Sequence, residues 1–332
     1  MSTLSLADAI AVQRHCTRPV WGPGSHVHGP SRCGSRDPHV CPSCAERFRL
    51  DWRRILYSGC LPSADVAADD LLGHSFYLLT LTAPSFGTIH RVPKHAGAAV
   101  SRCRCGVTHT LNDRHLMGVP VGAFDYQGAV AWNMSMPALW DQTRLRLRRA
   151  MPGYEYAAVR EWQARGLIHM HIILRVPTAQ ALTAAQIEAI AASARSGQTR
   201  WGRQSDCQEI AALGAAAGDT ARAVGYLAKT LGYTSKSWSS ILPSGPAGPW
   251  LAHRDRLYAT ALRTPCPRCP ALGPAACTGA AHRRLGASRA LVTISRPGDG
   301  RPGWSLAGLN RGRVQQERIA WARRQQIGRA HV

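Results

Sequence analysis

The chain has 332 residues, 45% of them hydrophobic, which is enough to bury one large core or two smaller ones. Its 41 Lys and Arg residues outnumber 19 Asp and Glu, giving a formal net charge of +22, and an excess of this size predicts a nucleic-acid partner. No run of 18 apolar residues occurs, and the N-terminal segment lacks a basic start followed by an apolar core, which argues against a membrane-spanning or secreted protein. We therefore expect a cytoplasmic protein that binds DNA and has no membrane partner.

The first third of the chain alternates irregular Cys/His-rich stretches with regular segments. "AERFRLDWRRILYSG" (45–59) has the pattern of a basic amphipathic helix. "HSFYLLTLTAP" (74–84) is aromatic and β-branched and ends at a proline, which predicts a buried strand. Residues 85–125 carry many Gly, His and Pro residues, as is typical of an elaborated insertion.

A basic helix is predicted over 136–151. Small or apolar side chains recur along it at spacings of four, four and three, which defines a core-facing stripe of Leu139, Thr143, Leu147 and Ala150. Arginines occupy its other sides, and we expect DNA contacts from Arg144, Arg146, Arg148 and Arg149.

Two strand-like runs follow, at 154–162 and 167–176. They are joined by "QARG", whose Gly166 can adopt the positive φ of a hairpin turn. An Ala-rich helix with Thr178 as its N-cap comes next, and a short strand is expected over 203–210.

The last third contains one strongly predicted helix, "DTARAVGYLAKTLGYTSK" (219–236), capped by Asp219. After residue 283 the composition is dominated by Arg and Gly, with a helical patch at 313–327, and we expect this tail to extend onto DNA or to be partly disordered. Taken in order, strand–helix–strand–strand–helix–strand predicts an α+β fold, with an antiparallel sheet and helices on one face.

Eleven cysteines in a reducing compartment favour metal sites over disulfides. Three groups have spacings that can supply zinc ligands, since a C-x2-C turn provides two corners of a tetrahedron. These groups are Cys33, Cys41 and Cys44 with Cys16; Cys103 and Cys105 with His109; and Cys266, Cys269 and Cys277 with His282. The alternative is free thiols, and Cys60 and Cys207 are expected to be packing residues.

"GLIHMHIIL" (166–174) places His169 and His171 on the same face of a strand. A hairpin loop with an odd number of residues puts Glu161 and Gln163 on that face, whereas an even loop puts them on the other. In the odd case two imidazoles and the Glu161 carboxylate, with Gln163 as a substitute, form a divalent-cation site that still admits a substrate oxygen. The opposite, apolar face then carries Trp162, Met170 and Ile172. The alternative is two unrelated surface histidines.

Tyr226, Lys229, Tyr233 and Lys236 lie on one stripe of the helix predicted at 219–236. A tyrosine with an unperturbed pKa of about 10 is a weak nucleophile at neutral pH. A lysine one turn away and a metal ion would favour the phenolate and offset negative charge in a phosphoryl-transfer transition state. The alternative is an amphipathic helix whose tyrosines extend from a core.

"FYLLTLTAPSFG", "REWQARGLIHMHIILRV" and "AVGYLAKTLGY" resemble, in this order, the three motifs of HUH-endonuclease replication initiators, in particular the rolling-circle initiators of actinobacterial plasmids. "CPSCAERFRLDW", "RCRCGVTH" and "CPRC" resemble the Cys-rich segments of that group, and the resemblance covers roughly residues 30–285. It implies the split βαβ, ferredoxin- or RRM-like sheet of HUH endonucleases with zinc-knuckle-like insertions. Together with the composition along the chain, it predicts an N-terminal Cys/His-rich region (1–72), the nickase domain (73–240), a Cys-rich module (241–285) and a basic tail (286–332), of which the tail shows little similarity to the family.

The resemblance also implies roles for individual residues. His169 and His171 would bind Mg²⁺ or Mn²⁺, with Glu161 completing the site. Tyr226 would nick one origin strand and remain attached through a 5′-phosphotyrosine, leaving a 3′-OH primer, and the strand would later be rejoined. Lys229 would be the helper cation, and Tyr233 remains open as a second nucleophile because family members carry one or two tyrosines.

Two other functions remain open. One is a conjugative relaxase or transposase with the same chemistry, and the other is a non-catalytic, zinc-stabilised DNA-binding regulator. The expected substrate is a plasmid origin, as single strand or extruded hairpin. No G-x-x-x-x-G-K-[ST] motif occurs, so we expect the host's helicase and polymerase as partners. The oligomeric state stays open.

Overall fold

The computed structural model describes residues 16–19, 32–36, 38, 40–58, 60, 73–99, 101–210, 248–266 and 292–295, and the single residues 269, 277, 282, 285 and 304. The predicted helices at 219–236 and 313–327 therefore lie outside the described residues, and with them Tyr226, Lys229 and Tyr233.

The described helices are α3 (Pro42–Ser58), α5 (Tyr126–Ala150), α6 (Ala184–Ala192) and α8 (Gly248–Arg263), with 3₁₀ turns η1 (Leu111–Leu116) and η2 (Thr178–Gln180). The described strands are β1 (His74–Thr82), β2 (Gly87–Ile89), β3 (Pro120–Phe124), β4 (Glu155–Trp162), β5 (Ile168–Pro177), β6 (Arg195–Ser196), β7 (Thr199–Arg200), β8 (Asp206–Ile210) and β9 (Val292–Ile294). Within this part of the chain, no helix combines the length and the apolar composition needed to cross a membrane.

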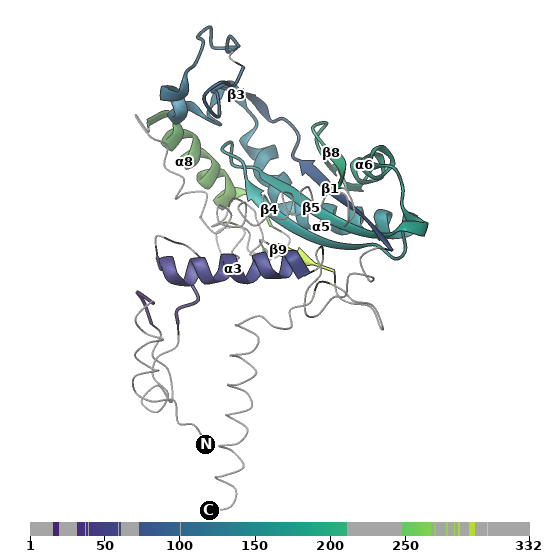
Figure 1. Ribbon diagram of the computed structural model, residues 1–332. Helices are drawn as coiled ribbons and strands as arrows, with labels where there is room; N and C mark the ends of the chain where they lie inside the picture. Colours follow the sequence, from purple (N-terminus) through teal and green to yellow (C-terminus); the bar gives the residue numbers. More distant parts are fainter. Residues whose placement is uncertain are drawn as a thin grey trace, which may run out of the picture.

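The main sheet has five strands in the order β8-β1-β5-β4-β9, and all neighbouring pairs are antiparallel (Figure 1). Its first four strands and two helices follow each other as β1-α5-β4-β5-α6-β8, which is the split βαβ order. The predicted α+β class with an antiparallel sheet is confirmed. The edge strand β9 comes from the segment predicted to be a basic tail.

Helices α5, α6 and α8 pack on one face of this sheet over the larger core (Figure 1). The predicted stripe of α5 is buried at Leu139, Thr143 and Leu147, but Ala150 at the end of the helix is exposed, so that part of the prediction was wrong. Trp201 Nε1 donates to Thr143 Oγ1 (2.9 Å), which itself donates to the carbonyl of Leu139 (2.8 Å). Each buried leucine in such a stripe contributes about 1.5–3 kcal/mol.

Helix α5 begins ten residues before the predicted start. The Asp125 side chain caps it by accepting from Gly128 N (2.8 Å), and Ala129 and Val130 are buried in its first turns. Pro137, near the start of the predicted segment, lies inside the helix rather than at its first turn.

Helix α6 is capped by Thr183 rather than by the predicted Thr178. Thr183 Oγ1 accepts from Gln186 N (3.3 Å), and Gln186 Oε1 accepts from Thr183 N (2.9 Å), which forms a capping box. Thr178 instead belongs to η2 and donates its backbone N–H to Gly73 O (2.8 Å).

The second face of the sheet is covered by α3, so the expectation that helices lie on one face only was wrong. Ile55 and Leu56 of α3 join a second core with strand residues Val159 and Ile173. Trp304 closes this core and donates from Nε1 to Leu56 O (3.3 Å). Because side chains alternate between the two faces of a strand, this core lies on the same face as the histidine pair.

Candidate functional site

The register of the β4–β5 hairpin decides which side chains accompany the histidines. Trp162 pairs with Ile168, so residues 163–167 form the loop, an odd number. Gly166 closes the turn with a φ of 79°. The odd register, which the sequence left open, is therefore the observed one. Glu161 lies directly opposite His169 on the same sheet face.

Each histidine is held by a threonine of the neighbouring strand β1. Thr82 Oγ1 lies 2.9 Å from His169 Nδ1, and Thr80 Oγ1 lies 3.2 Å from His171 Nδ1. With the ring proton on Nδ1 and donated to threonine, Nε2 of each ring keeps its lone pair. This arrangement is typical of metal-binding histidines, whose second nitrogen is tied to a neighbouring acceptor.

Glu161 and Gln163 approach different histidines. Glu161 Oε2 lies 3.3 Å from His171 Nε2, whereas Gln163 Nε2 lies 3.4 Å from His169 Nδ1. The Glu161 carboxylate therefore lies beside Nε2 of His171, the nitrogen that an ion would bind. The Gln163 amide lies beside Nδ1 of His169, which faces away from the proposed ion. Glu161 is the better placed of the two as a third metal ligand.

Burial, together with charge interactions from His171, Arg165 and Lys94, lowers the pKa of His169 to about 3. A histidine must be neutral to bind a metal ion. His169 is neutral at physiological pH and keeps a nitrogen lone pair available.

Arg165 ties the hairpin loop to the end of β1. Its Nε donates to Gln163 Oε1 (2.8 Å), and its terminal nitrogens donate to the carbonyls of Pro84 (2.9 Å) and Ala83 (3.0 Å). The guanidinium therefore joins the strand that carries the threonines to the loop beside the histidines.

Two helices hold the same loop from the other side. From α5, the fully buried Asn133 donates to Gly166 O (2.9 Å) and accepts from Ile168 N (3.2 Å). From α8, His253 Nε2 lies 3.4 Å from Arg165 O, and its Nδ1 lies 3.2 Å from the Tyr126 hydroxyl. The histidine pair is thus built on a hairpin with anchors to β1, α5 and α8.

All eleven cysteines are among the described residues, and none forms a disulfide. Three groups of four side chains have their ligand atoms within 4.8 Å of one another. They are Cys16, Cys33, Cys41 and Cys44; His90, Cys103, Cys105 and His109; and Cys266, Cys269, Cys277 and His282. The sequence named eleven of these twelve residues and missed His90.

The separations within these groups match zinc coordination. Sulfur atoms about 2.3 Å from a tetrahedral zinc ion are about 3.8 Å apart. Cys44 Sγ lies 3.8 Å from Cys16 Sγ, and Cys266 Sγ lies 3.8 Å from Cys277 Sγ. In the third group, His282 Nδ1 bonds Ala261 O (2.7 Å) while Nε2 faces Cys269 Sγ (3.3 Å), so its free nitrogen points to the cluster. All three groups could hold a metal such as zinc.

The histidine pair is more open than these clusters. Within the described residues, His169, His171 and Glu161 are not among the groups whose ligand atoms all lie within 4.8 Å of one another. The two imidazole centroids are 4.4 Å apart and nearly perpendicular. Such a set can supply two or three ligands to an ion and leave the other positions for water or substrate.

The predicted DNA-contacting arginines share helix α5 but differ in exposure. Arg146, Arg148 and Arg149 are exposed. Arg144 is half-buried, bonds Asp141, and lies 5.8 Å from the Tyr156 ring centroid. DNA contact remains a prediction for all four.

The sequence interpretation missed the residues that support the histidines: Thr80, Thr82, Asn133, Arg165 and His253. A signal existed for the two threonines, since the alternation in "LTLT" places both on one strand face beside a second strand with alternating histidines. Asn133 and His253 bond backbone atoms of the loop, and Arg165 bonds backbone carbonyls at the end of β1, and side-chain spacing carries no signal for such contacts.

These features define a basic α+β protein with side chains arranged for metal binding. The sequence profile described as "Replication initiator protein, pSAM2" (RepSA) matches residues 23–282, and the chain belongs to this family of replication initiators. A "Replication initiator protein" of Streptomyces ambofaciens is 30% identical over 244 residues, which cover 59% of this chain and 51% of that protein. The chain thus spans about half the length of this relative. No solved structure matches.

Proposed function

We propose that the protein initiates rolling-circle replication of a plasmid by nicking one origin strand through Tyr226, as HUH endonucleases do. Membership of a replication-initiator family supports a role in plasmid replication. It also favours an initiator over a conjugative relaxase or a transposase with the same chemistry.

The observation that carries the proposal is a pair of contacts between threonines of β1 and histidines of β5. Two threonine hydroxyls each face Nδ1 of a histidine, which leaves two Nε2 atoms for an ion beside the Glu161 carboxylate. A regulator with merely structural histidines has no need of two Nε2 atoms on one sheet face beside a carboxylate. The proposed ion is Mg²⁺ or Mn²⁺, which would withdraw charge from the scissile phosphate when bound.

In the proposed reaction, the Tyr226 phenolate attacks the phosphorus of one DNA linkage. The bond from phosphorus to the 3′ oxygen breaks, the 3′ oxygen takes up a proton, and the 5′ phosphate stays on tyrosine. Lys229, one helical turn from Tyr226, would favour the phenolate. The phosphodiester energy is conserved in the tyrosine ester, so the reverse attack by a 3′-OH rejoins a strand without ATP.

The test is formation of a covalent adduct between the full-length protein and a single-stranded origin oligonucleotide in Mn²⁺, with mass spectrometry of the attached peptide. We expect the oligonucleotide on Tyr226, no adduct with Tyr226→Phe, and an adduct with Tyr233→Phe and with the control Tyr258→Phe. An adduct in Tyr226→Phe would refute the nucleophile assignment.

The regulator alternative predicts a different result for the metal site. His169→Ala with His171→Ala should abolish the adduct while retaining origin binding if the proposal is right. No adduct with the wild-type protein under any divalent metal, together with specific origin binding, would instead establish the non-catalytic regulator.

A further inference from the structure

Residues 90–118 project from the β2–β3 hairpin as an arm (Figure 1, uppermost part). His90 N donates to Val119 O (2.9 Å) at its root, and η1 packs against α8. Among the described residues of the arm, the short 3₁₀ turn η1 is the regular element, and no β-strand or α-helix is found. Because the arm has so little regular structure, it needs an interaction other than a hydrophobic core, such as a bound metal ion, to hold its conformation.

The second Cys/His cluster supplies such order. His90 Nδ1 lies 3.0 Å from His109 Nε2 and 3.8 Å from Cys103 Sγ, and Cys105 Sγ lies 3.2 Å from His109 Nε2. Arg91 N donates to Cys103 Sγ (3.4 Å), and His109 Nδ1 lies 3.6 Å from the Asp113 carboxylate. A two-sulfur, two-nitrogen set suits a structural zinc ion and joins the start of the arm to residues 103–109.

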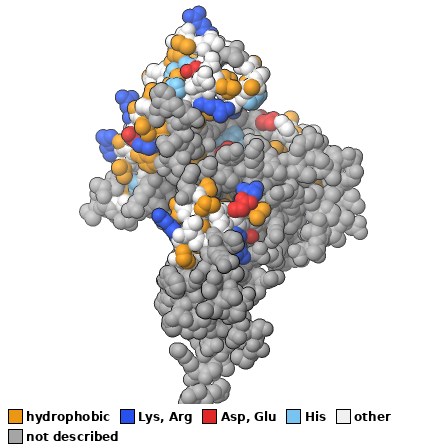
Figure 2. Space-filling view, turned by 60° about the vertical axis from the view of Figure 1, so that its left-hand side comes forward, with side chains coloured by type: hydrophobic (Ala, Val, Ile, Leu, Met, Phe, Trp, Pro, Cys, Tyr) orange, Lys and Arg blue, Asp and Glu red, His pale blue; other side chains and the backbone are white. Residues whose placement is uncertain are grey.

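The arm carries five basic side chains and one carboxylate: Arg91, Lys94, Arg102, Arg104 and Arg114 against Asp113. The basic residues are exposed and bond only hydroxyls or carbonyls among the contacts of the described residues, such as Arg104 with Thr88 Oγ1 (3.2 Å). Asp113 is already engaged with Thr110 N (2.8 Å). Figure 2 shows blue Lys and Arg side chains at the tip of the molecule and more along the same side.

The arm lies next to the histidine site. At Gly118, where the arm ends, an added Cβ would be 2.3 Å from the Ala164 carbonyl carbon of the hairpin loop, so the two backbones are in direct contact. Lys94 is close enough that its charge contributes to the low pKa of His169. A strand bound along the arm would therefore lead toward the histidines.

We propose that residues 90–118 form a zinc-organised arm that binds the phosphate backbone of DNA next to the histidine site. The proposal rests on the proposed function only in taking DNA as the polyanion. Basic side chains without carboxylate partners supply the sequence-independent attraction to phosphates. The Cys/His cluster holds them on one compact unit.

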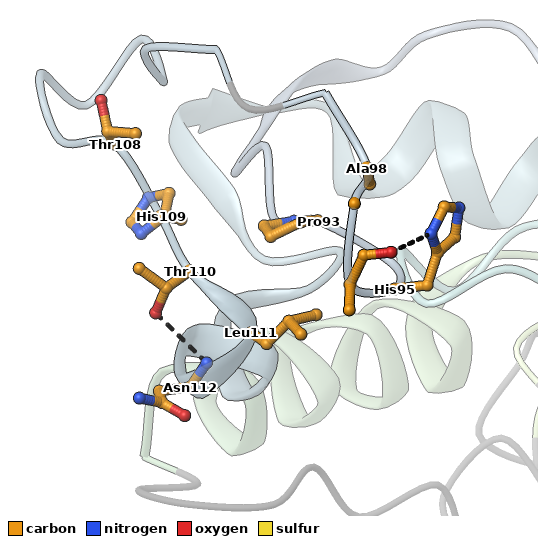
Figure 3. A pocket seen from close by; sticks show the side chains of 10 residues that line it. Pro93, His95, Ala98, Thr108, His109, Thr110, Leu111 and Asn112 are labelled. Atoms are coloured by element: carbon orange, nitrogen blue, oxygen red, sulfur yellow. Dashed lines mark hydrogen bonds between the residues drawn. The ribbon is translucent and has the colours of Figure 1, made fainter.

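A recess on the arm adds neutral hydrogen-bonding groups. It has a volume of about 380 Å³, within the range of small-ligand sites, and lies between residues 93–98 and 108–112. Figure 3 shows the hydroxyl of Thr108 and the side-chain amide of Asn112 along one side, with Pro93 and His95 across from them. The hydroxyl of Thr110 between them accepts from Asn112 N (3.2 Å). Hydroxyls and amides of this kind commonly position DNA through phosphate and sugar oxygens.

The test measures binding of full-length protein to random-sequence duplex and single-stranded oligonucleotides by fluorescence anisotropy across a salt series, without Mg²⁺ or Mn²⁺. The arm variant is Lys94→Ala, Arg102→Ala and Arg104→Ala together. The matched control removes three exposed charges elsewhere, with Arg195→Ala, Arg200→Ala and Arg203→Ala. If all three arm residues neutralise phosphates, the slope of log K against log salt becomes shallower by about 2.7 on duplex or about 2.1 on single strand.

A second variant tests the role of zinc. Cys103→Ser with Cys105→Ser should lose one equivalent of zinc, retain the other two, and show the shallower slope although all the arm's charges remain. An unchanged slope in the charge variant, or an equal change in the control, would refute the arm as a DNA contact. An unchanged slope in the cysteine variant would refute its organisation by zinc. Because none of these measurements needs nicking, a shallower slope in a protein that forms no adduct would overturn only the proposed function.

Discussion

Thr82 and His169 face each other across β1 and β5, with the hydroxyl oxygen 2.9 Å from Nδ1. This contact determines which nitrogen of His169 can reach an ion. We expect Thr82→Val, which keeps the shape and removes the hydroxyl, to weaken Mn²⁺ binding about 10- to 100-fold, as measured by calorimetry or electron paramagnetic resonance. Thr82→Ser keeps the hydroxyl and should bind as the wild type. Equal affinities for the valine and serine variants would show that the hydroxyl does not position the ring.

Asn133 links α5 to the hairpin loop through both ends of its amide. Asn133→Ala leaves Gly166 O and Ile168 N buried without this partner, and an unsatisfied buried group costs about 1–3 kcal/mol. We expect the free energy of unfolding to fall by about 2–5 kcal/mol in urea titrations. The exposed Asn112 is the control, and Asn112→Ala should change the free energy of unfolding by less than about 0.5 kcal/mol. A similar small effect at Asn133 would mean that the loop is held without the amide.

His253 should make stability depend on pH. Because the Arg165 carbonyl can only accept, Nε2 carries the proton and Nδ1 accepts from the Tyr126 hydroxyl. Burial lowers the pKa of His253 from 6.5 to about 4. Between these values the unfolded chain binds a proton that the folded chain does not, so stability falls as pH falls from 6.5 toward 4.

At about 1.4 kcal/mol per pKa unit, the loss attributable to His253 is about 2–3 kcal/mol across this range. Urea titrations at pH 7 and pH 4.5 should show a smaller difference for His253→Gln than for the wild type. The exposed His95 is the matched control, and His95→Gln should keep the wild-type difference. The pH dependence of stability that remains in His253→Gln is expected to come from other histidines with a lowered pKa, such as His169. An undiminished difference in His253→Gln would contradict the assignment.

The three Cys/His clusters predict the zinc content. Elemental analysis of purified protein should find three equivalents of zinc per chain, one for each cluster. Cys16→Ser and Cys277→Ser should each remove one equivalent and lower the unfolding temperature. Cys60 and Cys207 are buried outside the clusters, with pKa values raised by burial to about 12, and their serine variants should keep all three equivalents. Zinc lost from Cys207→Ser, or kept by Cys277→Ser, would argue against the assigned ligands.

The alternation of side chains along the sequence was sufficient to predict features that depend on a single strand. The alternation in "LIHMHIIL" predicted that Met170 and Ile172 are buried opposite the histidines, and both are fully buried in the larger core. Strands β1, β4, β5 and β8 follow the predicted runs within a few residues. These predictions depend on the two-residue period of a strand, which any fold must respect.

Prediction failed where a distant segment supplies the partner. His90 joins Cys103 and His109 only because the β2–β3 hairpin returns the chain, and spacing alone singled out the nearer residues. The turns of α5 before residue 136 were not predicted, but buried side chains hold them in place despite Pro137. Tertiary packing outweighs local propensity in such cases.

The sequence by itself determined the α+β class, the face shared by His169 and His171, and eleven of the twelve side chains in the Cys/His clusters. Those features follow from periodicity and from ligand chemistry along short stretches. Only the tertiary structure decided that the hairpin loop is odd, that threonines of β1 orient both imidazoles, and that α3 covers the histidine face. The reason is that register, tautomer and coverage depend on atoms from strands and helices far apart in the chain, whose approach no local spacing encodes.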